Sequence, residues 1–167
     1  MDASHFLTLA RHLVAGAEQA QPLTGGTGAA ECRCAIGRAY YATFLNARAF
    51  LAELGIGVPP DGSAHTAVYF ALNNSGVNVL AKIAVQLRGL YDSRTTADYD
   101  LVNTDVDRVS EAEIAIGRAD LALTVLDLIR RGRVNPPLDR PAVVNAILAW
   151  AKTAGWDQKL KRIAPRA

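Results

Sequence analysis

The sequence is poor in cysteine, has no long apolar run and carries no large excess of charge of one sign. Its two cysteines, Cys32 and Cys34, are two positions apart, so on a helix they point in nearly opposite directions. They can therefore neither pair with each other nor bind one metal ion together. No window approaches eighteen consecutive apolar residues, so we expect no membrane span. A net charge of +2 gives no strong reason to expect a nucleic-acid partner.

The two ends of the sequence differ in charge. Residues Met1–His5 lack the basic region and apolar core of a signal peptide, so we expect a cytoplasmic protein. Basic residues gather near the other end: Lys152, Lys159, Lys161, Arg162 and Arg166. A basic tail of this kind either contacts phosphates or is a solvated end, and the second is the more common case.

The sequence does have helical periodicity along almost its whole length. The spacing of Phe6, Leu9, Ala10 and Leu13 predicts a helix over about residues 3–19. A longer helix is expected over about residues 30–54, with an apolar stripe made of Ile36, Tyr40, Phe44, Ala47, Leu51 and Leu54. The glycine-rich residues 22–28 predict a flexible connector between the two helices, because neither a strand nor a Gly-Lys-Ser/Thr sequence accompanies them.

The same periodicity continues in the second half of the chain. We expect a third helix over residues 63–72 and a fourth whose apolar face comprises Val79, Leu80, Ile83, Leu87 and Leu90. Ser110 and Glu113 have the spacing of a capping box. They are expected to open a fifth helix, whose apolar residues are Ile114, Leu121, Val125, Leu128 and Ile129.

A boundary is expected at Asn135-Pro-Pro137, followed by a short helix over about residues 141–154. No strand alternation of useful length occurs. The sequence therefore predicts an all-α antiparallel bundle of four to five helices, residues 1–133, with a basic helical C-terminal extension, residues 134–167.

Two segments are unusually dense in polar and aromatic residues. One is Gly37–Phe44 in the second helix, and the other is Arg94-Thr-Thr-Ala-Asp-Tyr-Asp100 at the end of the fourth. Together with Ala47-Arg48, His65 and Val68, these segments resemble, in their order and spacing, the HEPN superfamily. More narrowly, the chain is similar to the small stand-alone bacterial and archaeal members, over roughly residues 30–131.

The resemblance implies a four- to five-helix bundle that usually forms a homodimer. Many members are metal-independent endoribonucleases with a motif of arginine, four to six residues, then histidine. The arginine holds the scissile phosphate, and the histidine moves protons while the 2′-hydroxyl attacks. Several members are encoded beside a minimal nucleotidyltransferase as toxin–antitoxin pairs. No metal or other cofactor is expected.

This chain departs from the nuclease motif, because Tyr99 stands where the histidine is expected after Arg94. A tyrosine with the ordinary pKa of about 10 is a poor proton shuttle at neutral pH. His65, at the start of the third helix, can replace the missing histidine in space, or it can serve as a cap or interhelical partner.

Arg94 and Asp98 each have two interpretations. Arg94 can clamp a phosphate with its guanidinium, or it can form an ion pair with Asp98 one helical turn later. Asp98 can act as a general base if burial raises its pKa, or it can be a structural partner of an arginine. Tyr99 is expected to pack its ring at the end of the bundle. Asp100 is expected to start a turn by accepting a backbone N–H.

Arg38 and Tyr41 lie three residues apart on one helix face, and we expect Arg38 to reach Asp98 or Asp100 across the bundle. The predicted site is thus a polar network made of Arg38, Tyr41, His65, Arg94, Asp98, Tyr99 and Asp100. Two functions remain open. One is an RNA-directed, toxin-like or defence-associated protein, such as a ribonuclease. The other is a catalytically inactive protein that binds a nucleotide or a partner such as a nucleotidyltransferase, or is modified on a tyrosine such as Tyr99.

Overall fold

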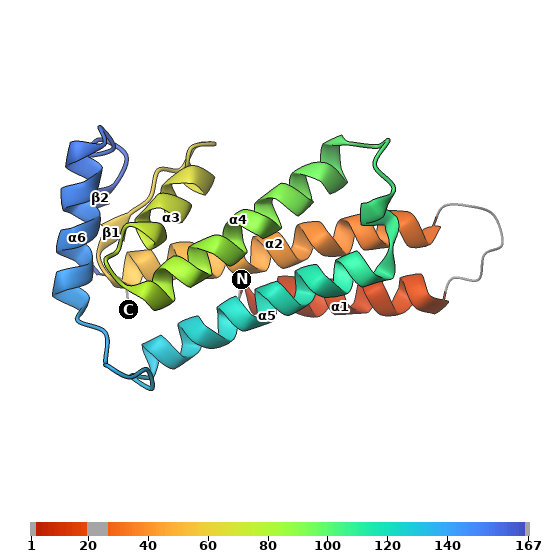
Figure 1. Cartoon of the computed structure of the whole chain (residues 1–167), viewed down its shortest axis with the longest axis horizontal. Coiled ribbons are helices and arrows are strands. Elements are labelled where there is room, and N and C mark those ends of the chain that lie inside the picture. Colours follow the sequence, from red (N-terminus) through yellow and green to blue (C-terminus); the bar gives the residue numbers. More distant parts are fainter. Residues whose placement is uncertain (1–2, 20–26, 166–167) are drawn as a thin grey trace. The chain divides into compact units, whose positions relative to one another are not determined.

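The computed structural model describes residues 3–19 and 27–165, and helices dominate both ranges (Figure 1). The α-helices are α1 (Ser4–Gln19), α2 (Thr27–Glu53), α3 (Ala64–Asn73), α4 (Asn78–Tyr99), α5 (Val109–Arg130) and α6 (Arg140–Thr153). A single 3-10 turn, η1 (Asp105–Asp107), precedes α5, and two short strands, β1 (Ile56–Gly57) and β2 (Lys161–Arg162), form the only sheet within the described ranges. The predicted all-α helical bundle is confirmed.

The helix boundaries follow from the turn residues in the sequence. α2 ends at Glu53, and Gly55 beyond it has a φ of 83°, which a residue with a side chain rarely adopts. α2 begins at Thr27, so Thr27 and Gly28 of the predicted connector belong to the helix. Residues 22–26 of that connector lie outside the described ranges. α5 begins at Val109, so Ser110 is inside the first turn and is not the N-cap.

The chain forms two compact units. Unit 1 comprises Met1–Thr43 and Gln86–Ala122, and unit 2 comprises Phe44–Val85 and Leu123–Ala167. The division falls within α2, α4 and α5, so each of these helices contributes a segment to both units. The separate extension expected over residues 134–167 stays a prediction.

Unit 1 consists of four helical segments from α1, α2, α4 and α5, which alternate in direction (Figure 1). The predicted stripe of α2 supplies Ile36 and Tyr40 to its core, both at most 1% exposed. The apolar face expected for α1 was partly wrong. Leu9 is 44% exposed, and the buried residues of α1 are Leu7, Ala10 and Val14.

The apolar face expected for α5 was also partly wrong, because Ile129 is buried as predicted whereas two of the other four residues are exposed. Ile114 is 47% exposed and Leu121 is 55% exposed. The buried positions in the unit 1 segment of α5 are instead alanines: Ala112, Ala115, Ala119 and Ala122. Small side chains let helix backbones approach each other closely, so this face fits a tightly packed interior. The sequence pattern pointed to the large residues because their side chains dominate any hydrophobicity count.

Unit 2 is built around the rest of the α2 stripe, and Phe44, Ala47, Leu51 and Leu54 are all buried as predicted. α3 contacts α6, and strand β1 pairs antiparallel with β2, which places Ile56 opposite Arg162. Gly57 permits this pairing, because a Cβ there would lie 2.9 Å from Cγ2 of Ile163.

An aromatic group joins α3 to α6 in unit 2. The ring of Phe70 on α3 is 5.1 Å from that of Trp150 on α6 and 5.5 Å from that of Trp156, between ring centroids. Offset or edge-to-face contacts at this distance add to the stability gained from area burial. No helix in the described ranges is long and apolar enough to cross a membrane.

Candidate functional site

The end of α4 carries an ion pair between Arg94 and Asp98. Because α4 continues to Tyr99, the two side chains lie one turn apart on the same face, and Nε of Arg94 is 2.6 Å from Oδ2 of Asp98. Only 17% of the Arg94 side chain and 35% of the Asp98 side chain are exposed. The Asp98 carboxylate also lies against α2, since a Cβ at Gly37 of that helix would lie 3.9 Å from Oδ1 of Asp98. The predicted ion pair is therefore confirmed, whereas the phosphate contact of Arg94 stays a prediction.

Two tyrosine rings flank the Arg94 guanidinium. Its central carbon lies 5.7 Å from the ring centroid of Tyr41 and 5.2 Å from that of Tyr99. One Nη of Arg94 also donates to the Tyr99 hydroxyl at 3.3 Å. Burial acts against the charged guanidinium, but Asp98 and the two tyrosines outweigh it and raise the pKa of Arg94. The guanidinium therefore stays charged, and its charge interacts with Asp98 and the two tyrosine rings of unit 1.

A cluster of three tyrosine rings, Tyr40, Tyr41 and Tyr91, adjoins Arg94. The ring of Tyr40 meets Tyr41 edge-on at 5.3 Å and Tyr91 at 5.8 Å. Tyr40 is 1% exposed. Burial raises the pKa of Tyr40, the neighbouring Tyr41 and Tyr91 raise it further, and Arg94 opposes them only in part. Tyr40 is therefore a neutral phenol in the folded protein at ordinary pH.

Arg33 of α2 is a polar centre that the sequence analysis did not identify. Its Nε donates to Oδ1 of Asp107, with which it forms an ion pair of 2.5 Å. One Nη donates to the carbonyl oxygens of Ala97 at 2.9 Å and Asp100 at 3.1 Å. The other Nη donates to the carbonyl oxygen of Asn103 at 2.6 Å. Arg33 thereby binds the whole connection between α4 and α5.

The sequence contained a signal for Arg33. It precedes Ile36 by three residues and Tyr40 by seven, so it extends the buried stripe of α2 toward its start. A charged residue on an apolar stripe requires partners, since an unpaired buried charge is costly. The partners were not predictable, because they are mainly backbone carbonyls of an irregular segment far along the chain.

Arg38 does not form the tie that we expected. Its guanidinium carbon lies 5.9 Å from the ring centroid of Phe6 on α1, and that ring is 6.4 Å from Tyr41. Arg38 and Tyr41 thus share a face, but this face meets α1. Arg33 and Arg38 are five positions apart and point in different directions from α2, so Arg33 reaches the α4–α5 connection instead.

The residues after Arg94 divide into one wrong and one confirmed prediction. Tyr99 is 71% exposed, so the expectation that its ring packs at the end of the bundle was wrong. α4 ends at Tyr99 itself, which leaves the ring with solvent on one side. Asp100 does start a turn, because its Oδ1 accepts from the backbone N–H groups of Val102 and Asn103, both at 3.2 Å.

The three histidines are divided between the two units. His65 belongs to unit 2, where its ring centroid is 4.4 Å from that of Phe44. Its role as a replacement for the motif histidine stays a prediction. His5 and His12 are exposed on α1. Across residues 3–19 and 27–165, no group of three or more His, Cys, Asp or Glu side chains is arranged to hold a metal ion.

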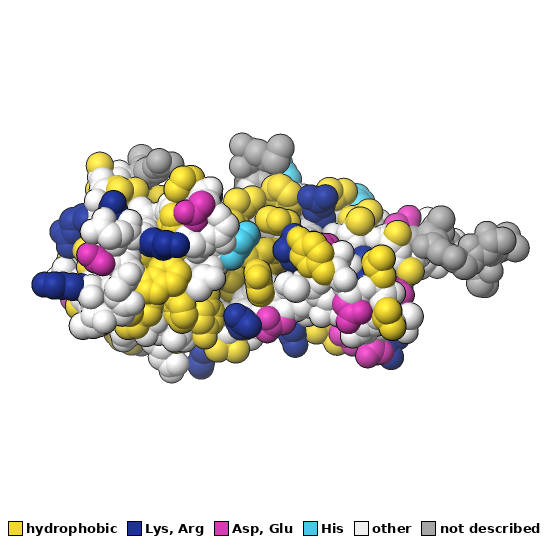
Figure 2. Space-filling model, turned by 90° about the horizontal axis from the view of Figure 1, so that it is seen from above, with side chains coloured by type: hydrophobic (Ala, Val, Ile, Leu, Met, Phe, Trp, Pro, Cys, Tyr) yellow, Lys and Arg dark blue, Asp and Glu magenta, His cyan; other side chains and the backbone are white. Residues whose placement is uncertain are grey.

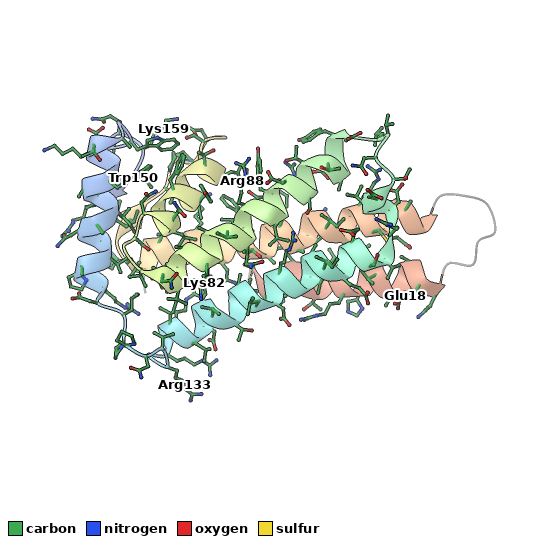
Figure 3. The ribbon with its side chains drawn as sticks, viewed as in Figure 1. Glu18, Lys82, Arg88, Arg133, Trp150 and Lys159 are labelled. Atoms are coloured by element: carbon green, nitrogen blue, oxygen red, sulfur yellow. The ribbon has the colours of Figure 1, made fainter. Side chains whose placement is uncertain are left out.

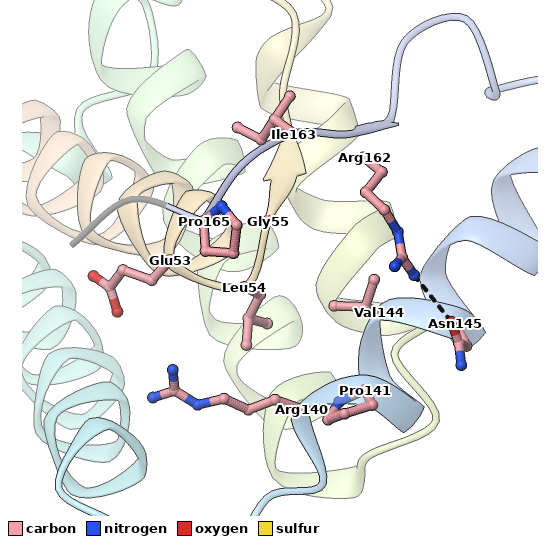
Figure 4. Close-up of a pocket in the computed structure, with 10 residues that line it drawn as sticks. All are labelled: Glu53, Leu54, Gly55, Arg140, Pro141, Val144, Asn145, Arg162, Ile163 and Pro165. Carbon is pink, nitrogen blue, oxygen red and sulfur yellow. Dashed lines mark hydrogen bonds between the residues drawn. The ribbon is translucent and has the colours of Figure 1, made fainter.

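Unit 2 has a pocket of about 430 Å³ between the end of α2, the start of α6 and β2 (Figure 4). Arg140 and Arg162 line it together with apolar residues, and Arg162 donates to Oδ1 of Asn145 at 3.1 Å. Glu53, also in the lining, accepts from Nε of Arg130 at 2.9 and 3.0 Å. Within the described ranges, no carboxylate lies within ion-pair distance of Arg140 or Arg162.

Further basic side chains of unit 2 face solvent. Figure 2 shows Lys and Arg side chains around the end that α6 occupies. Lys159 lies 5.5 Å from the ring centroid of Trp156, and Figure 3 shows it near Trp150 of α6. Arg133, also drawn in Figure 3, is exposed in the segment before α6. These cations remain available to an anionic ligand.

No family model, no curated protein and no solved structure matches this chain. The resemblance to the HEPN superfamily therefore stays a prediction that rests on the motifs around Arg38 and Arg94.

Proposed function

We propose that this chain is a HEPN-like protein that acts by binding a partner protein and does not itself cleave RNA. The partner that the resemblance implies is a minimal nucleotidyltransferase. The single observation that carries the proposal is that Arg94 is ion-paired with Asp98 and largely buried. Arg94 is the residue that corresponds to the arginine of the family's nuclease motif.

A phosphate clamp needs a guanidinium whose charge and donors are open to the ligand. The Nε of Arg94 is 2.6 Å from the Asp98 carboxylate, and the rings of Tyr41 and Tyr99 lie near its guanidinium. Only 17% of the Arg94 side chain is exposed. To bind a phosphate, Arg94 would have to break its ion pair with Asp98 and hold the phosphate next to the negatively charged Asp98 carboxylate. Both changes cost free energy, so both weaken phosphate binding by Arg94.

The missing motif histidine points the same way. The residue at that position is Tyr99, whose hydroxyl accepts a hydrogen bond from Arg94 at 3.3 Å. The Tyr99 hydroxyl oxygen is therefore already hydrogen-bonded to Arg94. This side chain is better suited to recognising a partner than to transferring a proton. The 71% exposure of Tyr99 makes it accessible to a partner protein.

The test for catalysis uses RNA in the presence of EDTA. Wild-type protein, Arg94→Ala and Asp98→Asn are each incubated with total RNA and with defined oligonucleotides. We expect intact RNA in all three reactions. Asp98→Asn is the informative control, because it removes the carboxylate and frees Arg94 for a phosphate. Fragments with 2′,3′-cyclic phosphate ends from wild type, absent with Arg94→Ala, would show that the protein is a ribonuclease and overturn the proposal.

The test for partner binding is co-expression of the tagged chain with minimal nucleotidyltransferases from the same genome. We expect one of them to co-elute in size-exclusion chromatography as a complex of fixed stoichiometry. Failure of every candidate to co-elute, with RNA intact, would reject the nucleotidyltransferase as the partner.

A further inference from the structure

The chain passes from α4 to α5 through a loop and the turn η1 (Figure 1). Apolar side chains at the start of this connection are exposed to solvent. Tyr99 is 71% exposed, Leu101 78% and Val102 91%, which makes them the most exposed large hydrophobic residues in the described ranges. We refer to these three residues as the apolar tip. Single exposed apolar residues are ordinary, but a contiguous group at a loop marks an interaction site.

The apolar tip is held rigidly. Arg33 donates to carbonyl oxygens of Ala97, Asp100 and Asn103, so one partly buried guanidinium fixes the backbone on both sides of Leu101 and Val102. Asp100 Oδ1 adds the two bonds to the backbone N–H groups of Val102 and Asn103. A loop fixed in this way loses little conformational entropy when it binds, which raises its affinity for a matching surface.

The apolar tip also carries one unpaired negative charge. Three of the four aspartates around it have arginine partners: Asp98 with Arg94, Asp107 with Arg33, and Asp105 with Arg108. Asp100 has no cation within ion-pair distance in the described part of the chain, and its carboxylate accepts only backbone N–H bonds there. Its charge therefore acts outward, between the exposed Tyr99 and Leu101.

This charge selects among possible occupants. An anionic membrane surface attracts loops rich in lysine and arginine, and a carboxylate at the centre of the contact would be repelled. RNA phosphates would be repelled for the same reason. A protein surface that combines an apolar hollow with a lysine or arginine at its edge is complementary in both hydrophobicity and charge.

We propose that the apolar tip docks into an apolar hollow with a basic edge on a partner protein, with Asp100 paired to the basic residue. The proposal rests on the proposed function, partner binding, and assigns the surface that performs it. Tyr99 supplies the aromatic anchor, and Leu101 and Val102 supply the aliphatic contacts.

The first experiment identifies the partner by its contact. Photoreactive benzoylphenylalanine is placed at Val102 and, in a control, at Leu121, which is apolar and 55% exposed on α5. Both variants are irradiated in cells of the source organism. The proposal expects an adduct with one protein from position 102 that is absent from position 121. The absence of such an adduct, or an adduct only with a second copy of this chain, overturns it.

The second experiment uses that partner in pure form and measures binding by isothermal titration calorimetry. We expect Val102→Asp to weaken binding at least about tenfold, which corresponds to about 1.4 kcal/mol. Asp100→Lys should weaken it as well, and Leu121→Asp should change it less than about threefold. The thermal midpoint of Val102→Asp should equal that of wild type, because the side chain is 91% exposed.

The outcomes separate this proposal from the proposed function. A partner that binds wild type and Val102→Asp equally well leaves partner binding in place and removes the apolar tip as its site. RNA cleavage that depends on Arg94 removes the proposed function itself, and that result comes from a different assay on the same protein.

Discussion

The two units differ in charge, although they share three helices. The described part of unit 1 has ten acidic and seven basic residues, whereas that of unit 2 has five acidic and ten basic residues. The ion pairs are also unequally divided. Within the described ranges, five arginines of unit 1 form ion pairs, whereas two arginines of unit 2 do so. Most charged residues in the described part of unit 1 form ion pairs within that unit, whereas the described part of unit 2 has a surplus of cations that form none.

This difference changes how the polar motif is understood. A dense group of arginines, aspartates and tyrosines looks like a site in the sequence, but in unit 1 these residues satisfy each other. Exposed ion pairs add little stability, whereas removing one partner of a partly buried, hydrogen-bonded pair is strongly destabilising. Most of the described cations that form no ion pair lie in unit 2, in residues that carry no recognisable motif.

The largest expected effect is on the internal ties of unit 1. Arg33→Ala removes a side chain that is 14% exposed and leaves Asp107 and three carbonyl groups without their donor. We expect a loss of about 3 kcal/mol in the free energy of unfolding, measured in urea. The matched control is Arg38→Ala on the same helix, which loses only a cation–π contact with Phe6 and should cost about 0.5–1 kcal/mol. Equal losses in the two variants would contradict the role given to Arg33.

The alanine face of α5 tests the interior of unit 1. Ala119 is fully buried, so Ala119→Leu should overpack the helix contact and cost about 2 kcal/mol, measured by thermal or urea unfolding. Leu121, two positions later, is 55% exposed, and Leu121→Ala should change stability by less than about 0.5 kcal/mol. The reverse order of the two effects would mean that the large residues face the core after all.

The charge surplus predicts where polyanions bind. Reversing Lys159, Lys161 and Arg162 to glutamate in unit 2 should weaken binding to heparin or single-stranded RNA about tenfold at low salt. Reversing Arg88, Arg108 and Arg118 in unit 1 is the control with the same change in net charge, and a smaller effect is expected. Fluorescence anisotropy at several salt concentrations measures both. Equal weakening would show that only net charge matters.

The smallest effect concerns pH. Burial raises the pKa of Tyr40 in the folded protein, so above about pH 10 the unfolded chain releases this proton while the folded protein retains it. Tyr40 therefore contributes stability below pH 10 that is lost as pH rises beyond it. In Tyr40→Phe the fall in stability above pH 10 should be shallower by up to about 1.4 kcal/mol per pH unit. Urea unfolding of both proteins from pH 8 to 11 measures this, and parallel curves would reject the assignment.

The sequence predicted the helices well, because apolar periodicity and turn residues act locally. Gly55 ends α2 where expected, and all six residues of the α2 stripe are buried. The ion pair between Arg94 and Asp98 was predictable for the same reason, since it joins two positions one turn apart on one helix. Contacts between distant segments were harder. Arg38 was expected to reach the end of α4, and Arg33 does so instead.

The sequence by itself therefore determined the all-α class, the course of each helix and the local pairs within them, since these depend on spacing along one element. Tertiary structure decided which positions of α1 and α5 are buried and which arginine binds the α4–α5 connection. Ile114 and Leu121 are exposed although they are large and apolar, because close approach of helices in unit 1 selects the alanines. Burial depends on the neighbours that a helix acquires, and a single helical period does not contain that information.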